Sequence, residues 1–114
     1  MMDLKEQKKG AVVVLTLTGR LDATTSGPLE ETLLCLIERG ETKLALNFHR
    51  LDYISSAGLR VLLVAAKRLK PPNGKIVLFS LNPQVREVFE IAGFTGILPI
   101  AATEEDALRS VQKS

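Results

Sequence analysis

The chain has 114 residues, of which 46% are hydrophobic and 25% charged, a composition typical of one soluble globular domain spanning residues 1–114. Its 15 basic and 13 acidic side chains leave a net charge of +2, too small to favour direct binding to nucleic acid or to an anionic membrane. No apolar run approaches the roughly 20 residues that span a bilayer, and the N-terminus has no apolar signal region, so we expect a cytoplasmic protein without membrane insertion.

Two strands are expected at the start of the chain. Residues 11–18 are almost all β-branched or apolar, which favours a strand that is covered on at least one side. The charged segment 4–8 predicts a weaker strand at the edge of the sheet, and Lys9-Gly10 would form the hairpin turn between the two.

A first helix is predicted over residues 28–39. The Thr- and Ser-rich segment before it supplies N-cap residues, and Pro28 suits the first helical turn. Gly40 would end the helix, and a short apolar strand is expected over 43–48. Cys35 is the single cysteine, which excludes an internal disulfide. Because it lies in a leucine-rich stretch, we expect a buried structural thiol.

The second half of the chain continues the alternation of strands and helices. Residues 56–69 carry apolar side chains at helical spacing and predict a well-buried helix. The remaining expected elements are a strand over 75–80, a helix from Asn82-Pro83 to Gly93, a brief strand over 96–100 and a short last helix that begins near Thr103.

This order predicts an α/β domain with a mixed, mostly parallel sheet of 4–5 strands and about four helices. Each strand–helix–strand unit would pair its strands in parallel with a right-handed crossover. Parallel strands place their carboxyl ends at one edge of the sheet, where open α/β sheets carry their sites. Asp22, Ser55, Ser56 and Asn82 all follow predicted strands, so they are candidate neighbours at that edge.

Ser55 and Ser56 stand at the start of the predicted second helix. A hydroxyl there can cap the helix, bind an anion or carry a phosphate, and local chemistry alone favours the cap. Asp22 has a similar simple explanation as a turn residue. Gly58 is harder to explain, since glycine in a first helical turn costs up to about 1 kcal/mol relative to alanine. We expect either an adjacent segment or a partner to approach its backbone.

Several kinds of site are not supported by the sequence. There is neither a phosphate-binding P-loop nor a dinucleotide-binding glycine motif. His49 is the only histidine, and with no second ligand at suitable spacing we expect no metal and no cofactor. Neither serine lies in a Gly-x-Ser-x-Gly nucleophile elbow, so we do not expect an enzyme.

Three segments match the motifs of a known family in the correct order. They are residues 19–22 (GRLD), 53–63 (YISSAGLRVLL) and 88–94 (VFEIAGF). Together they resemble the STAS domain, and more narrowly the bacterial anti-sigma factor antagonists, also called anti-anti-sigma factors. The resemblance covers nearly the whole chain, in the free-standing form of the domain.

This resemblance implies a partner-switching function. In the family, the unphosphorylated antagonist binds an anti-sigma factor that is a serine kinase, and thereby frees a sigma factor. The kinase phosphorylates a serine at the start of the second helix and releases the antagonist, which a PP2C-type phosphatase restores. The family motif Asp-Ser-Ser/Thr/Ala-Gly-Leu aligns at Gly58-Leu59, which implies Ser56 as the phosphorylation site, with Ser55 as the fallback. Ser55 itself stands where the family has aspartate.

The family also uses an acidic residue near its partner or nucleotide contact, and Asp22 matches it. The implied partner-binding residues are Asp22, Ser55, Ser56, Ala57, Gly58 and Arg60. Two alternatives stay open: an accessory STAS subunit that scaffolds a membrane-transport or stress-signalling complex without being phosphorylated, and a sensor with a weak purine nucleotide site.

Overall fold

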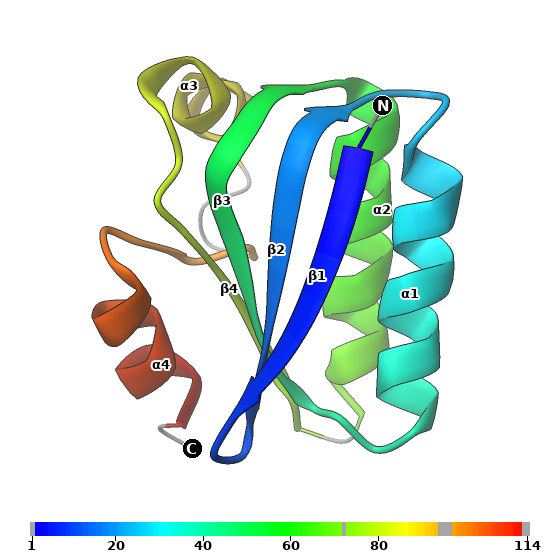
Figure 1. The fold of residues 1–114 in the computed structure, drawn as a ribbon, viewed down its shortest axis with the longest axis vertical. Coiled ribbons are helices and arrows are strands. Elements are labelled where there is room, and N and C mark those ends of the chain that lie inside the picture. Colours follow the sequence, from blue (N-terminus) through cyan, green and yellow to red (C-terminus); the bar gives the residue numbers. More distant parts are fainter. Residues whose placement is uncertain (1, 72, 94–96, 113–114) are drawn as a thin grey trace.

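A computed structural model describes residues 2–71, 73–93 and 97–112. These residues form one sheet of five strands together with four helices (Figure 1). In chain order the elements are β1 (Met2–Lys9), β2 (Val12–Leu21), α1 (Ser26–Glu38), β3 (Lys43–Ile54), α2 (Ser56–Leu69), β4 (Lys75–Phe79), α3 (Pro83–Ala92), β5 (Ile100–Ala101) and α4 (Glu104–Gln112).

The strand order β1-β2-β3-β4-β5 follows the chain order. The hairpin partner β1 is antiparallel to β2, whereas the pairs β2–β3, β3–β4 and β4–β5 are parallel. The predicted class, a mixed and mostly parallel α/β sheet, is therefore confirmed. The edge position of charged β1 is confirmed as well, because this strand pairs only with β2.

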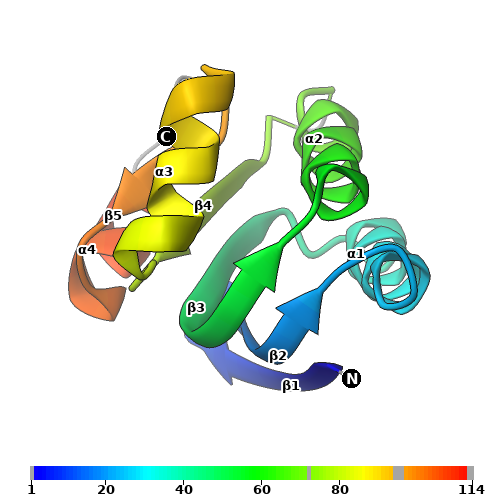
Figure 2. The same cartoon turned by 90° about the horizontal axis from the view of Figure 1, so that it is seen from above.

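Helices cover both faces of the sheet, as Figure 2 shows. Alternate side chains of β2 serve the two faces: Val13, Leu15 and Leu17 belong to the large core under α1 and α2, whereas Val12 and Val14 belong to a smaller core under α4. A strand buried on both sides needs apolar residues at successive positions, which accounts for the unbroken run in β2.

Helices α1 and α3 pack against the sheet through a narrow stripe of buried apolar side chains. In α1, the fully buried side chains Leu29, Leu33 and Leu36 lie at spacings of four and three residues and so share one face. In α3, Phe89 packs against Phe48 of β3 with the ring centroids 6.3 Å apart, which attaches the helix to the same large core.

The prediction of a buried Cys35 thiol is wrong, because Cys35 is exposed. It precedes Leu36 by one residue, and one residue is a turn of about 100° around a helix. With Leu36 directed at the sheet, Cys35 therefore lies outside the buried stripe, whatever the leucine content around it.

Strand β3 runs to Ile54, although its end was predicted at Phe48. Two register shifts against β2, each with an extra residue on β3, break the alternation of apolar and polar side chains in this part of the strand. The extension pairs with β2 alone, since β4 pairs with β3 only as far as Asn47. The segment expected to be a loop is therefore an edge strand that leads directly into α2.

Strand β2 continues three residues past its predicted end, to Leu21, and β1 covers Met2–Lys9 instead of residues 4–8. The bounds of α2 are those predicted, and α1 begins two residues earlier, at Ser26 instead of Pro28. Part of the predicted strand 96–100 and the last residue of the segment 88–94 lie outside the described residues. The described residues 97–99 do not form a strand, so the prediction is correct only at Ile100, where β5 begins. Helix α4 follows β5 as predicted.

Candidate functional site

The carboxyl ends of β2 and β3 meet at one edge of the sheet, as the predicted topology requires. The backbone N–H of Ser55 donates a hydrogen bond of 2.9 Å to the carbonyl of Leu21, the last residue of β2. This bond joins the start of α2 to the loop that follows β2. Asp22, Ser55 and Ser56 are thus brought to the same end of the molecule.

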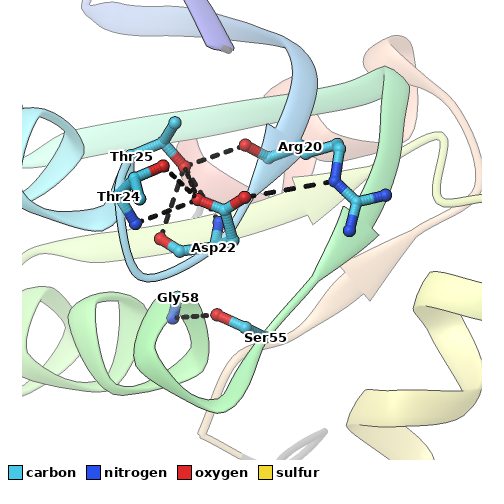
Figure 3. Close-up of polar contacts among 6 residues, drawn as sticks. All are labelled: Arg20, Asp22, Thr24, Thr25, Ser55 and Gly58. Carbon is cyan, nitrogen blue, oxygen red and sulfur yellow. Dashed lines mark hydrogen bonds and ion pairs between the residues drawn. The ribbon is translucent and has the colours of Figure 1, made fainter.

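The first turn of α2 gives its two serines different roles. Ser55 is the N-cap, with an extended backbone, and its side-chain oxygen accepts a hydrogen bond of 3.3 Å from the N–H of Gly58 (Figure 3). Its carbonyl accepts from the N–H of Leu59. Ser56 is the first helical residue and is exposed, and its hydroxyl has no hydrogen bond among the described residues.

Gly58 is buried where α2 crosses the end of β2. A Cβ atom at this position would lie 2.5 Å from Cγ of Leu21 and 3.2 Å from Cγ1 of Ile54. Of the two expected explanations for this glycine, an adjacent segment is therefore correct. Gly58 lets the helix approach the strand closely. The solvent-facing side of this first turn is formed by Ser56, Ala57 and Arg60.

The Asp22 carboxylate is held by the loop that follows it (Figure 3). Its Oδ1 accepts hydrogen bonds from the backbone N–H of Thr24 at 3.0 Å, from the Thr24 hydroxyl at 2.7 Å and from the Thr25 hydroxyl at 3.3 Å. The hydrogen bond from the Thr24 side chain is the largest cause that lowers the pKa of Asp22, and together these bonds outweigh the partial burial that would raise it. Asp22 is therefore an anion at neutral pH.

Thr25 lies in the segment expected to cap α1, but it makes no side-chain cap bond and supports this loop instead. Arg20 and Tyr53, which the sequence reasoning missed, support it as well. The hydroxyl of Thr25, which is buried, donates to the carbonyl of Arg20 at 2.8 Å and accepts from the N–H of Asp22 at 2.9 Å. The Arg20 guanidinium lies 4.3 Å from the centroid of the Tyr53 ring, and its Nε is 4.0 Å from Oδ2 of Asp22. An aspartate followed closely by two threonines is a turn pattern that could have indicated the threonine contacts. Nothing in the sequence indicated the Arg20–Tyr53 stack, since the two residues lie on different strands.

A shallow hollow separates the starts of α1 and α2. Its volume is about 360 Å³, and it is lined by Ser26, Glu30, Ser56, Ala57, Arg60 and Val61. The exposed hydroxyl of Ser56 therefore shares an open cavity with a cationic side chain of its own helix and an anionic side chain of the neighbouring helix.

Asn82, the fourth candidate neighbour, serves α3 instead. Its Oδ1 accepts a hydrogen bond of 2.8 Å from the N–H of Val85, which caps that helix, and its Nδ2 donates to the carbonyl of Leu51 at 3.0 Å. Both polar ends of the side chain are therefore used to attach α3 to β3.

His49 lies on the exposed part of β3. Among residues 2–71, 73–93 and 97–112 there is no group of three side chains that could hold a metal ion. Within the same ranges, no helix has both the length and the apolar character needed to cross a bilayer.

The sequence is similar to that of proteins named as anti-sigma factor antagonists. Residues 3–107 match the family model of the STAS domain. The chain is 43% identical over 106 residues to a Bordetella bronchiseptica protein named "Putative anti-sigma factor antagonist BtrV", an alignment that covers 93% of this chain and 91% of that protein.

Solved structures agree with this comparison. The anti-sigma factor antagonist SpoIIAA in its unphosphorylated form is 27% identical, with a TM-score of 0.75 and complete coverage of both chains. Its phosphorylated form, from Bacillus, gives a TM-score of 0.74 over 96% of this chain and 100% of that one. An anti-sigma factor antagonist from Mycobacterium paratuberculosis has the same fold, with a TM-score of 0.91 at 20% identity over 99% and 96% of the two chains. The resemblance found in the motifs is confirmed, and the chain belongs to the STAS domain family.

Proposed function

We propose that this chain is an anti-sigma factor antagonist. In this proposal it binds an anti-sigma factor that is a serine kinase, and thereby releases a sigma factor in the cytoplasm. Phosphorylation of Ser56 ends the association, and a PP2C-type phosphatase restores it. The chain is the kinase's substrate and has no enzymatic role of its own. The similarity to proteins named as antagonists supports the binding to an anti-sigma factor. The exposed hydroxyl of Ser56 supports the regulation by phosphorylation.

The geometry of the first turn of α2 favours Ser56 over Ser55 as the acceptor. The Ser55 side chain is engaged as the cap of the helix, through its bond to the N–H of Gly58, and phosphorylation would replace that cap. The Ser56 hydroxyl is exposed at the first helical position and has no competing bond within the described part of the chain. A kinase can therefore reach Ser56 without unwinding the helix.

A phosphate on Ser56 would alter the surface and leave the fold intact. A phosphoserine adds about −1.5 to −2 charges, and at an exposed helix N-terminus it is locally favourable by roughly 0.3–1 kcal/mol. The same charge is costly at an interface, because a hydrated dianion must lose water on docking. It would also add to the negative charge of Asp22, which lies at the same edge of the sheet.

Incubation of the chain with an anti-sigma factor kinase of the same organism and ATP, followed by mass mapping, tests the proposal. We expect one phosphate, located on Ser56, and no incorporation in Ser56→Ala. Ser26→Ala is the matched control, because Ser26 lines the same hollow and is likewise the first residue of its helix. It should be phosphorylated at the rate of the wild type.

Other results would favour different functions. A phosphate found on Ser55 would mean that Ser55, and not Ser56, is the phosphate acceptor. Stable binding to the kinase without phosphate transfer would indicate a scaffold subunit. Saturable binding of a purine nucleotide, with no binding to the kinase, would indicate a nucleotide sensor.

A further inference from the structure

Arg60 lies one helical turn beyond Ser56, on the same side of α2. Residues four apart on a helix face each other, with about 5–6 Å between their Cβ atoms, and helical side chains lean toward the N-terminus. Arg60 therefore extends back in the direction of Ser56. Their shared lining of the hollow between α1 and α2 is the structural result of this spacing.

The Arg60 guanidinium has no ion pair or hydrogen bond among the described residues. Arg39 and Arg109, by contrast, are paired with carboxylates. Arg60 stays unpaired although Glu30 of α1 lines the same hollow. The first turn of α2 also contains no acidic side chain. The hollow thus presents an exposed cation beside an exposed hydroxyl, and Glu30, the anionic side chain in its lining, pairs with neither of them among the described residues.

We propose that Arg60 binds the phosphate of phosphorylated Ser56 within the same chain. This proposal rests on the proposed function, in which the kinase transfers the γ-phosphoryl group of ATP to the Ser56 oxygen, forming ADP and releasing the hydroxyl proton. An acid placed four residues before a base is the favourable order on a helix. A guanidinium can also make two parallel hydrogen bonds to phosphate oxygens, which a lysine cannot.

This contact gives the phosphate a second effect on the surface. In the unphosphorylated chain, Arg60 is free to bind an acidic group of a partner. In the phosphorylated chain, the guanidinium is occupied by the phosphate. Phosphorylation would therefore replace an available cation by an ion pair with a net negative charge, since the phosphate carries about −1.5 to −2 charges and the guanidinium +1.

The ³¹P NMR titration of the full chain with phosphoserine incorporated at position 56 during translation tests this contact. The second pKa of a phosphoserine is about 6, and a nearby cation lowers it by favouring the dianion. We expect Arg60→Gln to raise this pKa by about 0.2–0.4, the size expected for an exposed pair of this spacing. Glu30→Gln should lower it, because a neighbouring negative charge is removed.

Arg68→Gln is the matched control, since it removes the same charge from the last turn of α2. It lies about 18 Å farther along the helix than Ser56, beyond the screening length at physiological salt. We expect no change in the phosphate pKa of this variant. Equal pKa values in Arg60→Gln and Arg68→Gln, or a raised value in Glu30→Gln, would overturn the proposal. Because no kinase is used, failure here is distinguishable from failure of the proposed function.

Discussion

The starts of α1 and α2 resemble each other in sequence but differ in what they expose. The two helices lie side by side on one face of the sheet (Figure 1). Each begins with a serine, Ser26 in α1 and Ser56 in α2, and both serines line the hollow between the helices. Within the described part of the chain, the Ser26 hydroxyl makes a hydrogen bond and the Ser56 hydroxyl makes none.

In α1 the preceding residue does not cap the helix. Thr25 has a helical backbone and makes no side-chain cap bond, because its hydroxyl is used to hold the Asp22 loop. The Ser26 hydroxyl lies 3.4 Å from the carbonyl of Ala23 and donates to it. The polar groups at this helix start therefore serve the structure of the loop.

In α2 the preceding residue takes over the structural role. Ser55 is extended and caps the helix through Gly58, which leaves Ser56 with no structural task. In this chain, the serine without a hydrogen bond stands at the start of the helix whose preceding residue provides the cap. The following predictions test this difference between the two helix starts.

The largest effect is expected for a negative charge at position 56. Ser56→Asp should weaken binding to the anti-sigma factor kinase by roughly a hundredfold, about 3 kcal/mol, because the charge must be desolvated on docking. Ser56→Ala should bind like the unphosphorylated wild type. Isothermal titration calorimetry with the purified kinase measures all of these affinities.

Ser26→Asp tests whether the effect belongs to the start of α2. It places the same charge at the equivalent position of α1, and we expect a loss of binding below about tenfold. Equal losses for Ser26→Asp and Ser56→Asp would mean that the hollow as a whole, and not the start of α2, faces the partner.

The next largest effect is a change in stability when the glycine in the first turn of each helix is replaced by alanine. Gly58→Ala should lower the free energy of unfolding by about 1–3 kcal/mol, because the new methyl group would overlap the buried side chain of Leu21. Gly27→Ala in α1 should instead raise it by up to about 1 kcal/mol, since open space surrounds that position and alanine favours the helix. Urea denaturation measures both changes.

The prediction requires that the two substitutions change the free energy of unfolding in opposite directions. A stabilising Gly58→Ala would show that α2 and β2 can separate at little cost. In that case the close approach at Gly58 would not explain the glycine.

The smallest effect is expected from loss of the cap. Ser55→Ala should lower the free energy of unfolding by about 1 kcal/mol, because the N–H of Gly58 loses its acceptor. Ser55→Asp should retain the stability of the wild type, since aspartate caps equally well. Thermal unfolding followed by circular dichroism compares the two variants. Equal losses in both would show that Ser55 is not acting as a cap.

Most elements of the fold follow from local patterns in the sequence. The strand β2, the helix α2 and the start of α3 at Asn82-Pro83 were predictable because hydrophobic periodicity and cap residues act over one or two turns of chain. The parallel topology then followed from element order alone. It correctly predicted that Asp22, Ser55 and Ser56 lie at one edge.

Tertiary contacts decided the features that distinguish the site. The extension of β3 depends on register shifts against another strand, and the exposure of Cys35 depends on which side of α1 faces the sheet. The neighbour of Gly58 is Leu21, a residue far from it in the chain. A local pattern contains no information about such distant partners. For the same reason, only the folded structure places Glu30 of α1 in the hollow beside Ser56, whereas the nearness of Arg60 follows from its spacing of four residues on the same helix.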